Sequence, residues 1–158
     1  MIEKADLRKI VILARLSDSM LEKLIPHLEL LQFKDQQKIF DEGTTAKYFY
    51  MLKSGKVLLE KRISSGVSVS MGAIKPGYSF GWSAISSQNP FSMIATSAED
   101  SGVFSIKGES ILEILQNDHS MGFLIMQSLN RILKNRLDRI EEQFLRSIRE
   151  HPDFVDLL

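Results

Sequence analysis

The chain has 158 residues, with 20 basic and 20 acidic side chains and therefore a formal net charge of zero. This length suits one domain with a substantial core, and the balanced charge points to neither nucleic acid nor an acidic surface as a partner. The absence of cysteine excludes disulfides, cysteine-ligated zinc, iron–sulfur clusters and a thiol nucleophile. No apolar run approaches the roughly 20 residues of a membrane span, so we expect a cytoplasmic protein without a membrane partner.

Residues 1–32 predict a helical lead-in to the rest of the chain. Leucines and isoleucines recur at helical spacing between Leu13 and Leu28. Ser17 followed by Asp18 is typical of a helix N-cap, and Pro26 marks a break or an end. We interpret this segment as a pair of packing helices.

Residues 33–106 consist of short segments rich in β-branched and aromatic side chains, separated by glycines. This pattern favours an antiparallel sandwich or barrel. KSGK at 53–56 predicts a hairpin turn between two strands, and SSG at 64–66 predicts another turn. The helix-like segment WSAISS interrupts the β region once. The segments that we expect to be strands are KIF, YFYMLK, KVLLEKRI, VSVSMGAI and GVFSI.

Residues 109–150 predict two helices, a short one in GESILEILQNDHS and a long one from about Met121 to Ile148. A heptad laid on the long helix gives an apolar seam with Asn130 at one a position, which is typical of a parallel coiled-coil dimer. We therefore expect a homodimer through this helix; the alternative is that the seam packs on its own β region. Pro152 is expected to end the helix. The a positions are Phe123, Asn130, Leu137 and Phe144, and the d positions are Met126, Leu133, Ile140 and Ser147.

Two motifs connect this order of elements with a known family. IFDEGTTAKYFYMLKSG, residues 39–55, runs from a strand through a Gly turn into four apolar residues and a second Gly, and PGYSFG follows at 76–81. Over residues 15–145 the chain resembles the cyclic-nucleotide-binding domain, the effector domain of catabolite-activator-type regulators. The resemblance implies an α+β fold in a single domain over 1–158. Its expected parts are an antiparallel β jelly-roll barrel, N-terminal helices, a short phosphate-cassette helix and a long C-terminal helix. Phe40 departs from the Val, Ile or Cys that is usual in the family.

The family's phosphate cassette aligns without a gap to residues 80–93, FGWSAISSQNPFSM. In members that bind cyclic nucleotides, a short helix and an Arg hold the phosphate, and a Glu accepts a hydrogen bond from the ribose. Here Trp82 stands at the Glu position and Phe91 at the Arg position. The ligand-binding positions that the resemblance implies are Phe80, Gly81, Trp82, Ser83, Ala84, Phe91, Ser92 and Met93, with Ile140 and Glu141 on the long helix.

Loss of both polar anchors argues against cAMP or cGMP as the effector. A hydrogen bond to a charged group contributes about 1.5–3 kcal/mol, so loss of the Arg alone would weaken phosphate binding by roughly ten- to a few-hundredfold. Three interpretations remain open. The pocket binds a less polar ligand between aromatic walls; or the rings fill it themselves, leaving a ligand-free dimerisation scaffold; or an Arg of the long helix rescues a weakened nucleotide site. The candidates for that Arg are Arg131, Arg136 and Arg139.

We therefore predict a non-catalytic small-ligand sensor or regulatory domain. No resident cofactor is expected; the effector is a cyclic nucleotide or another small molecule. His27, His119 and His151 have no partner at metal-ligand spacing, and no P-loop or dinucleotide motif occurs. The family's regulators carry a helix-turn-helix after the long helix, but the six residues after Pro152 cannot form one. We expect a stand-alone domain that acts through a protein partner; the alternative is a fragment of a longer protein.

Overall fold

The computed structural model describes residues 2–86 and 90–150. It divides into two compact units, one up to Leu124 and the other beginning at Ile125. All the strands belong to the first unit, and α4 runs through the division. The elements in chain order are α1 Lys4–Leu7, α2 Asp18–Leu24, η1 Ile25–His27, β1 Leu28–Phe33, β2 Lys38–Phe40, β3 Tyr48–Ser54, β4 Val57–Ser64, β5 Val67–Ile74, β6 Ser79–Phe80, η2 Trp82–Ile85, β7 Ile94–Ser97, β8 Ser101–Lys107, α3 Gly108–Asn117 and α4 His119–Arg149.

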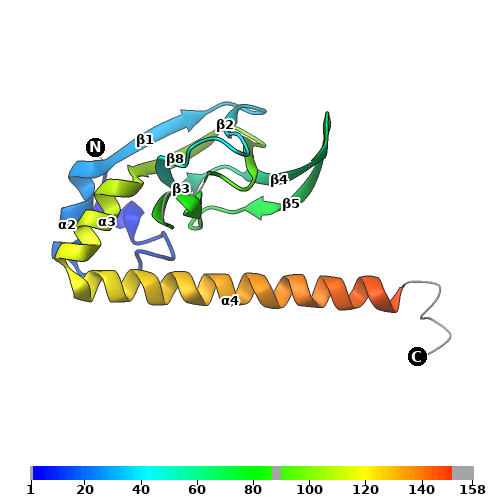
Figure 1. The fold of residues 1–158 in the computed structure, drawn as a ribbon. Coiled ribbons are helices and arrows are strands. Elements are labelled where there is room, and N and C mark those ends of the chain that lie inside the picture. Colours follow the sequence, from blue (N-terminus) through cyan, green and yellow to red (C-terminus); the bar gives the residue numbers. More distant parts are fainter. Residues whose placement is uncertain (1, 87–89, 151–158) are drawn as a thin grey trace. The chain divides into compact units, whose positions relative to one another are not determined.

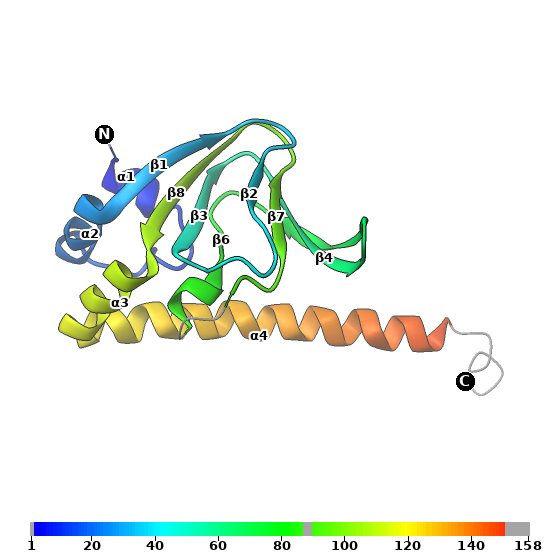
Figure 2. The same cartoon turned by 45° about the horizontal axis from the view of Figure 1, so that its top comes forward.

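The strands form two antiparallel four-stranded sheets, which confirms the predicted jelly-roll architecture. One sheet has the order β1-β8-β3-β6 and the other β2-β7-β4-β5. Figure 1 and Figure 2 show β1, β8 and β3 side by side in the first sheet. The two sheets are separate and are not closed into a barrel, so each keeps two edge strands.

The predicted turn at residues 64–66 is confirmed, but the hairpin predicted at residues 53–56 is wrong. Ser64 pairs with Val67, so β4 and β5 form a hairpin around Gly66. By contrast, β3 pairs with β6 and β8, and β4 pairs with β5 and β7. The tight turn at Gly55 therefore carries the chain from one sheet to the other. Gly55 has a φ of 89°, a conformation that glycine adopts without strain. The presence of a turn glycine, however, does not reveal whether the two strands that flank it pair with each other.

The lead-in is helical only as far as His27, so the predicted boundary at residue 32 is wrong. The predicted cap is confirmed, because the Ser17 hydroxyl accepts a hydrogen bond from the Met20 N–H at 3.3 Å. Pro26 lies in the 3-10 turn η1, which ends the helical part. Residues 28–33 then form β1, in register with β8 from Leu28↔Ile106 to Phe33↔Ser101. That partner lies more than 60 residues further along the chain, beyond the reach of a local pattern.

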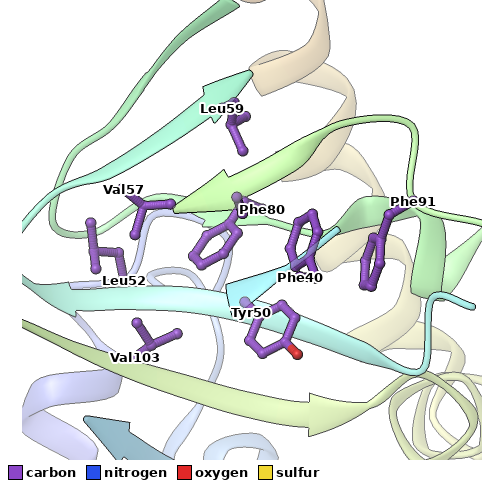
Figure 3. Close-up of a cluster of buried hydrophobic side chains, with 9 residues drawn as sticks. Phe40, Tyr50, Leu52, Val57, Leu59, Phe80, Phe91 and Val103 are labelled. Atoms are coloured by element: carbon purple, nitrogen blue, oxygen red, sulfur yellow. The ribbon is translucent and has the colours of Figure 1, made fainter. Parts of the chain in front are cut away.

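A buried hydrophobic cluster lies between the two sheets and joins side chains from six strands and the cassette. Figure 3 shows it, with the rings of Phe40, Tyr50, Phe80 and Phe91 gathered beside its aliphatic side chains. The members, which we call the aromatic cluster, are Phe40, Tyr50, Leu52, Val57, Leu59, Phe80, Phe91, Ala95 and Val103.

Helices α3 and α4 confirm the two helices predicted after residue 108. In α4 the predicted apolar seam is exposed: Phe123 is 67% exposed, Leu137 52% and Phe144 63%. Pro152, predicted to end this helix, lies outside the described residues. Among the helices that the structure describes, none has the length and apolar character needed to span a bilayer.

Candidate functional site

The cassette backbone turns sharply at Gly81. Gly81 is left-handed, with φ 73° and ψ 33°, and a Cβ there would lie 2.9 Å from Cδ2 of Tyr50. A side chain at this position would therefore be strained and crowded. The 3-10 turn η2 follows immediately, and the Ala84 N–H donates to the Gly81 carbonyl at 3.1 Å. Behind it, a Cβ on Gly108 would lie 2.1 Å from the Ala84 carbonyl oxygen, so α3 begins directly against this turn.

Phe91 is fixed on the other side of the cassette by its own backbone. Its N–H donates to the Thr44 carbonyl at 2.9 Å, and its carbonyl accepts from the Gly43 N–H at 2.8 Å. These bonds tie the cassette to the loop between β2 and β3, which the first family motif encodes. The Phe91 side chain is only 5% exposed. An aromatic ring at the Arg position is thus turned into the protein rather than left in solvent.

The Phe91 ring stacks on Phe40, the other departure from the family pattern. Their centroids are 3.7 Å apart with planes 12° from parallel, and Figure 3 shows the two rings face to face. Phe40 also lies 5.7 Å from Tyr50 and 6.1 Å from Phe80, and Tyr50 stacks on Phe80 at 5.3 Å. Burial raises the pKa of the Tyr50 phenol, and Tyr48 adds to that shift. The four rings make an apolar stack between the sheets.

Trp82 is half-buried and directed by a hydrogen bond of its own. Its indole Nε1–H donates to Oγ of Ser79 at 3.1 Å, and Ser79 is buried in β6. An indole can donate a hydrogen bond but cannot accept one. The residue therefore cannot replace a carboxylate that accepts from a ribose hydroxyl.

Charges lie at the rim of the cassette, and they are paired with one another. Lys61 Nζ lies 2.5 Å from Oε1 of Glu42 and 2.8 Å from the Ser92 carbonyl oxygen. The Lys61 hydrogen bond, with a further one from the Arg62 N–H, holds the pKa of the Glu42 carboxyl below its usual range. Asp41 is similarly engaged by Lys38 at 2.8 Å. These ammonium groups are committed to carboxylates and do not present unopposed charge to a phosphate.

The other predicted site residues are placed as follows. Ser83 is half-buried and Ala84 is buried in η2, while Ser92 is exposed and Met93 packs against the aromatic cluster. Phe80 belongs to the cluster itself. Ile140 and Glu141 are exposed on α4, in the unit that begins at Ile125. Their part in a ligand site stays a prediction.

The arrangement suits apolar packing better than anion chemistry. No Lys or Arg occurs between Lys75 and Lys107, and the described ranges 2–86 and 90–150 contain no group of three or more His, Cys, Asp or Glu side chains placed to hold a metal ion. A pocket of about 170 Å³ lies outside the cassette and is lined by Asp6, Lys9, Ile10, Lys53, Pro76 and Gly77. None of the predicted site residues lines it.

The sequence identifies the two aromatic replacements, Trp82 and Phe91, but does not reveal that Phe40 stacks on Phe91. Phe40 looked like a mild departure in a strand, 51 positions before Phe91. The available signal was that both positions had gained an aromatic side chain. The antiparallel pairing of β2 with β7, together with the hydrogen bonds of Phe91 to Gly43 and Thr44, brings Phe40 and Phe91 together.

A family model described as the cyclic nucleotide-binding domain matches residues 30–118 of the chain. This stretch covers more than half of the sequence and contains both motifs. No curated protein matches the chain significantly.

Solved structures with the same fold cover most of the chain. A candidate cyclic nucleotide-binding protein from Geobacter metallireducens is 25% identical, with a TM-score of 0.75 over 87% of this chain and 99% of its own. The sensor domain of the transcriptional regulator DNR from Pseudomonas aeruginosa is 20% identical, with a TM-score of 0.71 over 85% and 91%. The catabolite activator protein of Thermus thermophilus is 21% identical, with a TM-score of 0.71 over 88% and 64%.

Proposed function

The chain belongs to the cyclic nucleotide-binding domain family, and we propose that it is a non-catalytic regulatory domain that does not use cAMP or cGMP. The observation that carries this proposal is the buried Phe91 ring, stacked 3.7 Å from Phe40 at the position where the family holds its phosphate-binding Arg. The short turn of the cassette after Gly81 is present. At the two positions where the family has a charged Glu and Arg, this chain has the aromatic residues Trp82 and Phe91.

Energetics support the exclusion of a cyclic phosphate. To bind one, the protein would have to bury an anion beside four aromatic rings, without the Arg that normally pairs with it. An unpaired buried charge costs several kcal/mol. The left-handed Gly81 and the short turn η2 offer only backbone dipoles, which contribute about 0.3–1 kcal/mol when exposed. The remaining attraction is too small to offset the cost.

A second candidate function is sensing of a planar apolar effector. The half-buried Trp82 supports it, together with the partly buried Tyr48 and Met93 beside the aromatic cluster. Such an effector would displace the Phe91 ring and take its place on Phe40. Aromatic walls with a few placed polar groups are typical of small-molecule sites.

We expect no thermal stabilisation of the purified chain by millimolar cAMP or cGMP. A ligand at 100 times its Kd adds about 2.7 kcal/mol to the free energy of unfolding, which raises the Tm of a chain of this size by several degrees. Differential scanning fluorimetry with each nucleotide, and with indole as a planar apolar probe, measures this. A clear shift with a nucleotide would contradict the proposal. A shift with indole alone would favour the second candidate.

We further propose that the regulatory output passes through a homodimer formed by α4. The exposed seam supports this, because a strip of large apolar side chains on one helix face is costly to leave in water. Its exposed members are Phe123, Met126, Leu133, Leu137, Ile140 and Phe144.

Replacing Leu133 and Leu137 together by glutamate should convert the dimer into a monomer. Each substitution sets like charges opposite each other across the seam of a symmetric pair. Sedimentation velocity on the wild type and the variant measures the change in mass. The matched control is Asn135→Glu, an exposed f position that should leave the dimer intact. A dimeric double variant, or a monomeric wild type at high micromolar concentration, would refute this use of α4.

A further inference from the structure

The β5 edge of the second sheet differs from the other three sheet edges. Strand β2 has three residues and includes Lys38, β6 has two residues, and β1 carries Glu29. Short length and charge are the devices by which proteins stop an edge from pairing with another chain. Strand β5 uses neither. It has eight residues, and the whole run from Ser64 to Ile74 contains no charged side chain.

The same strand exposes an apolar row on one face. Val67, Val69 and Met71 alternate with serines and are 51%, 44% and 48% exposed. Alternate residues of a regular strand lie on the same face, so Val67 and Val69 share one face, and Met71 follows them at the irregularity between Ser70 and Gly72. Within the part of the chain that the structure describes, β5 pairs only with β4. The N–H and C=O groups on its other side are left for a further strand.

We propose that β5 pairs antiparallel with β5 of a second copy of this chain, about a two-fold axis at Val69. Such an axis sets Val69 opposite its own copy and Ser68 opposite Ser70 of the second copy, all within the regular part of the strand. Apolar side chains then face apolar side chains on one face and hydroxyls face hydroxyls on the other, which is the pairing that stabilises a sheet.

The absence of charged side chains from β5 favours a second copy of this chain as the strand that pairs with its free edge. In a symmetric pair, the residue on the axis always faces itself, so any charge there meets a like charge. A strand that accepts a foreign peptide has no such constraint and can carry charges that match its partner's. An eight-residue edge strand without a charged side chain, in a chain with 20 basic and 20 acidic residues, fits self-pairing.

The local backbone limits the contact to a short segment. Ser70 pairs with Glu60 and Gly72 with Leu59, so Met71 forms a β-bulge that twists the end of the strand. The regular part of the free edge is therefore Val67–Ser70. A contact of this length is weak on its own, and it uses a surface different from the α4 seam. It does not depend on the state of the aromatic cluster.

Cysteine cross-linking tests the proposal, because the chain has no native cysteine. In the Val69→Cys variant of the 158-residue chain, the two thiols lie opposite each other across the axis, within reach of a disulfide. In Val67→Cys the two copies are offset by four residues, about 14 Å along the strand, and cannot bond. Leu30→Cys, an exposed position on the β1 edge, is the matched control for random collision.

We expect Val69→Cys to form covalent dimers at least about tenfold faster than either other variant under mild oxidation, because only it meets the geometry of a disulfide. Circular dichroism melts check that all three proteins are folded, and non-reducing gels measure the rates. Equal rates for Val69→Cys and Leu30→Cys would overturn self-pairing and leave the edge to a strand of another protein. A faster Val67→Cys would overturn the register.

Discussion

Replacing Phe91 by alanine is expected to lower the free energy of unfolding by about 3–5 kcal/mol, the usual cost of removing a buried Phe side chain. The ring is 5% exposed and stacks on Phe40 at 3.7 Å, with Tyr50 and Phe80 behind it. Its backbone is held by Thr44 and Gly43, so the chain cannot easily collapse into the space. A cavity that its neighbours do not fill is costly. Urea unfolding of the wild type and of Phe91→Ala measures the difference in their free energies of unfolding.

The same variant also shows whether the cluster can accept a ligand. An apolar cavity of this kind stays dry and binds small aromatic molecules. We therefore expect indole to stabilise Phe91→Ala in a melt and to leave the wild type unchanged. The control is Tyr78→Ala, since Tyr78 is 44% exposed and its loss should cost less than about 1 kcal/mol. A Phe91→Ala variant as stable as this control would show that the ring is not part of the core.

The fold was predictable because its signals are local or belong to a family motif. Ser17 caps a helix through its own side chain. Gly66 lies in the turn of a hairpin whose two strands, β4 and β5, are neighbours in the sequence. The β-branched and aromatic composition of short segments between glycines predicted five of the strands, and helical periodicity predicted the last two helices; both signals lie within one element. The signals that failed are those that depend on a distant partner. Strand β1 pairs with β8, and the Gly55 turn crosses between sheets.

The candidate site shows the same division. The motif FGWSAISS predicted a short helical segment, and the structure has the 3-10 turn η2 there. The stack of Phe91 on Phe40 does not follow from either residue's neighbours, because packing between sheets is decided by tertiary contacts. The sequence likewise left open whether the Trp82 side chain lines a ligand pocket or fills it. Its hydrogen bond to Ser79 depends on where β6 places that hydroxyl.

The stack also changes what would be needed to restore a nucleotide site. Trp82→Glu with Phe91→Arg supplies the two missing polar groups, but the Phe40 ring would remain packed against position 91, where the new guanidinium begins. The family usually has Val, Ile or Cys at the position of Phe40. Phe40→Val removes most of the ring and keeps a β-branched side chain in the strand. We therefore expect the triple variant to bind cAMP more tightly than the double variant, by tenfold or more, which is about 1.4 kcal/mol.

The triple variant should be a protein whose folding depends on its ligand. Without cAMP, it buries an unpaired guanidinium among apolar side chains, so its Tm should fall well below that of the wild type. With cAMP at 100 times the Kd, the ligand restores about 2.7 kcal/mol, because a charge-assisted Arg–phosphate pair forms at the same place. Melts of the wild type, the double variant and the triple variant across a cAMP titration separate these effects. Trp82→Glu alone is the control, since it leaves Phe91 in the stack and should not respond. A folded triple variant whose Tm ignores cAMP would contradict the assignment of residues 80–93 as the former phosphate site.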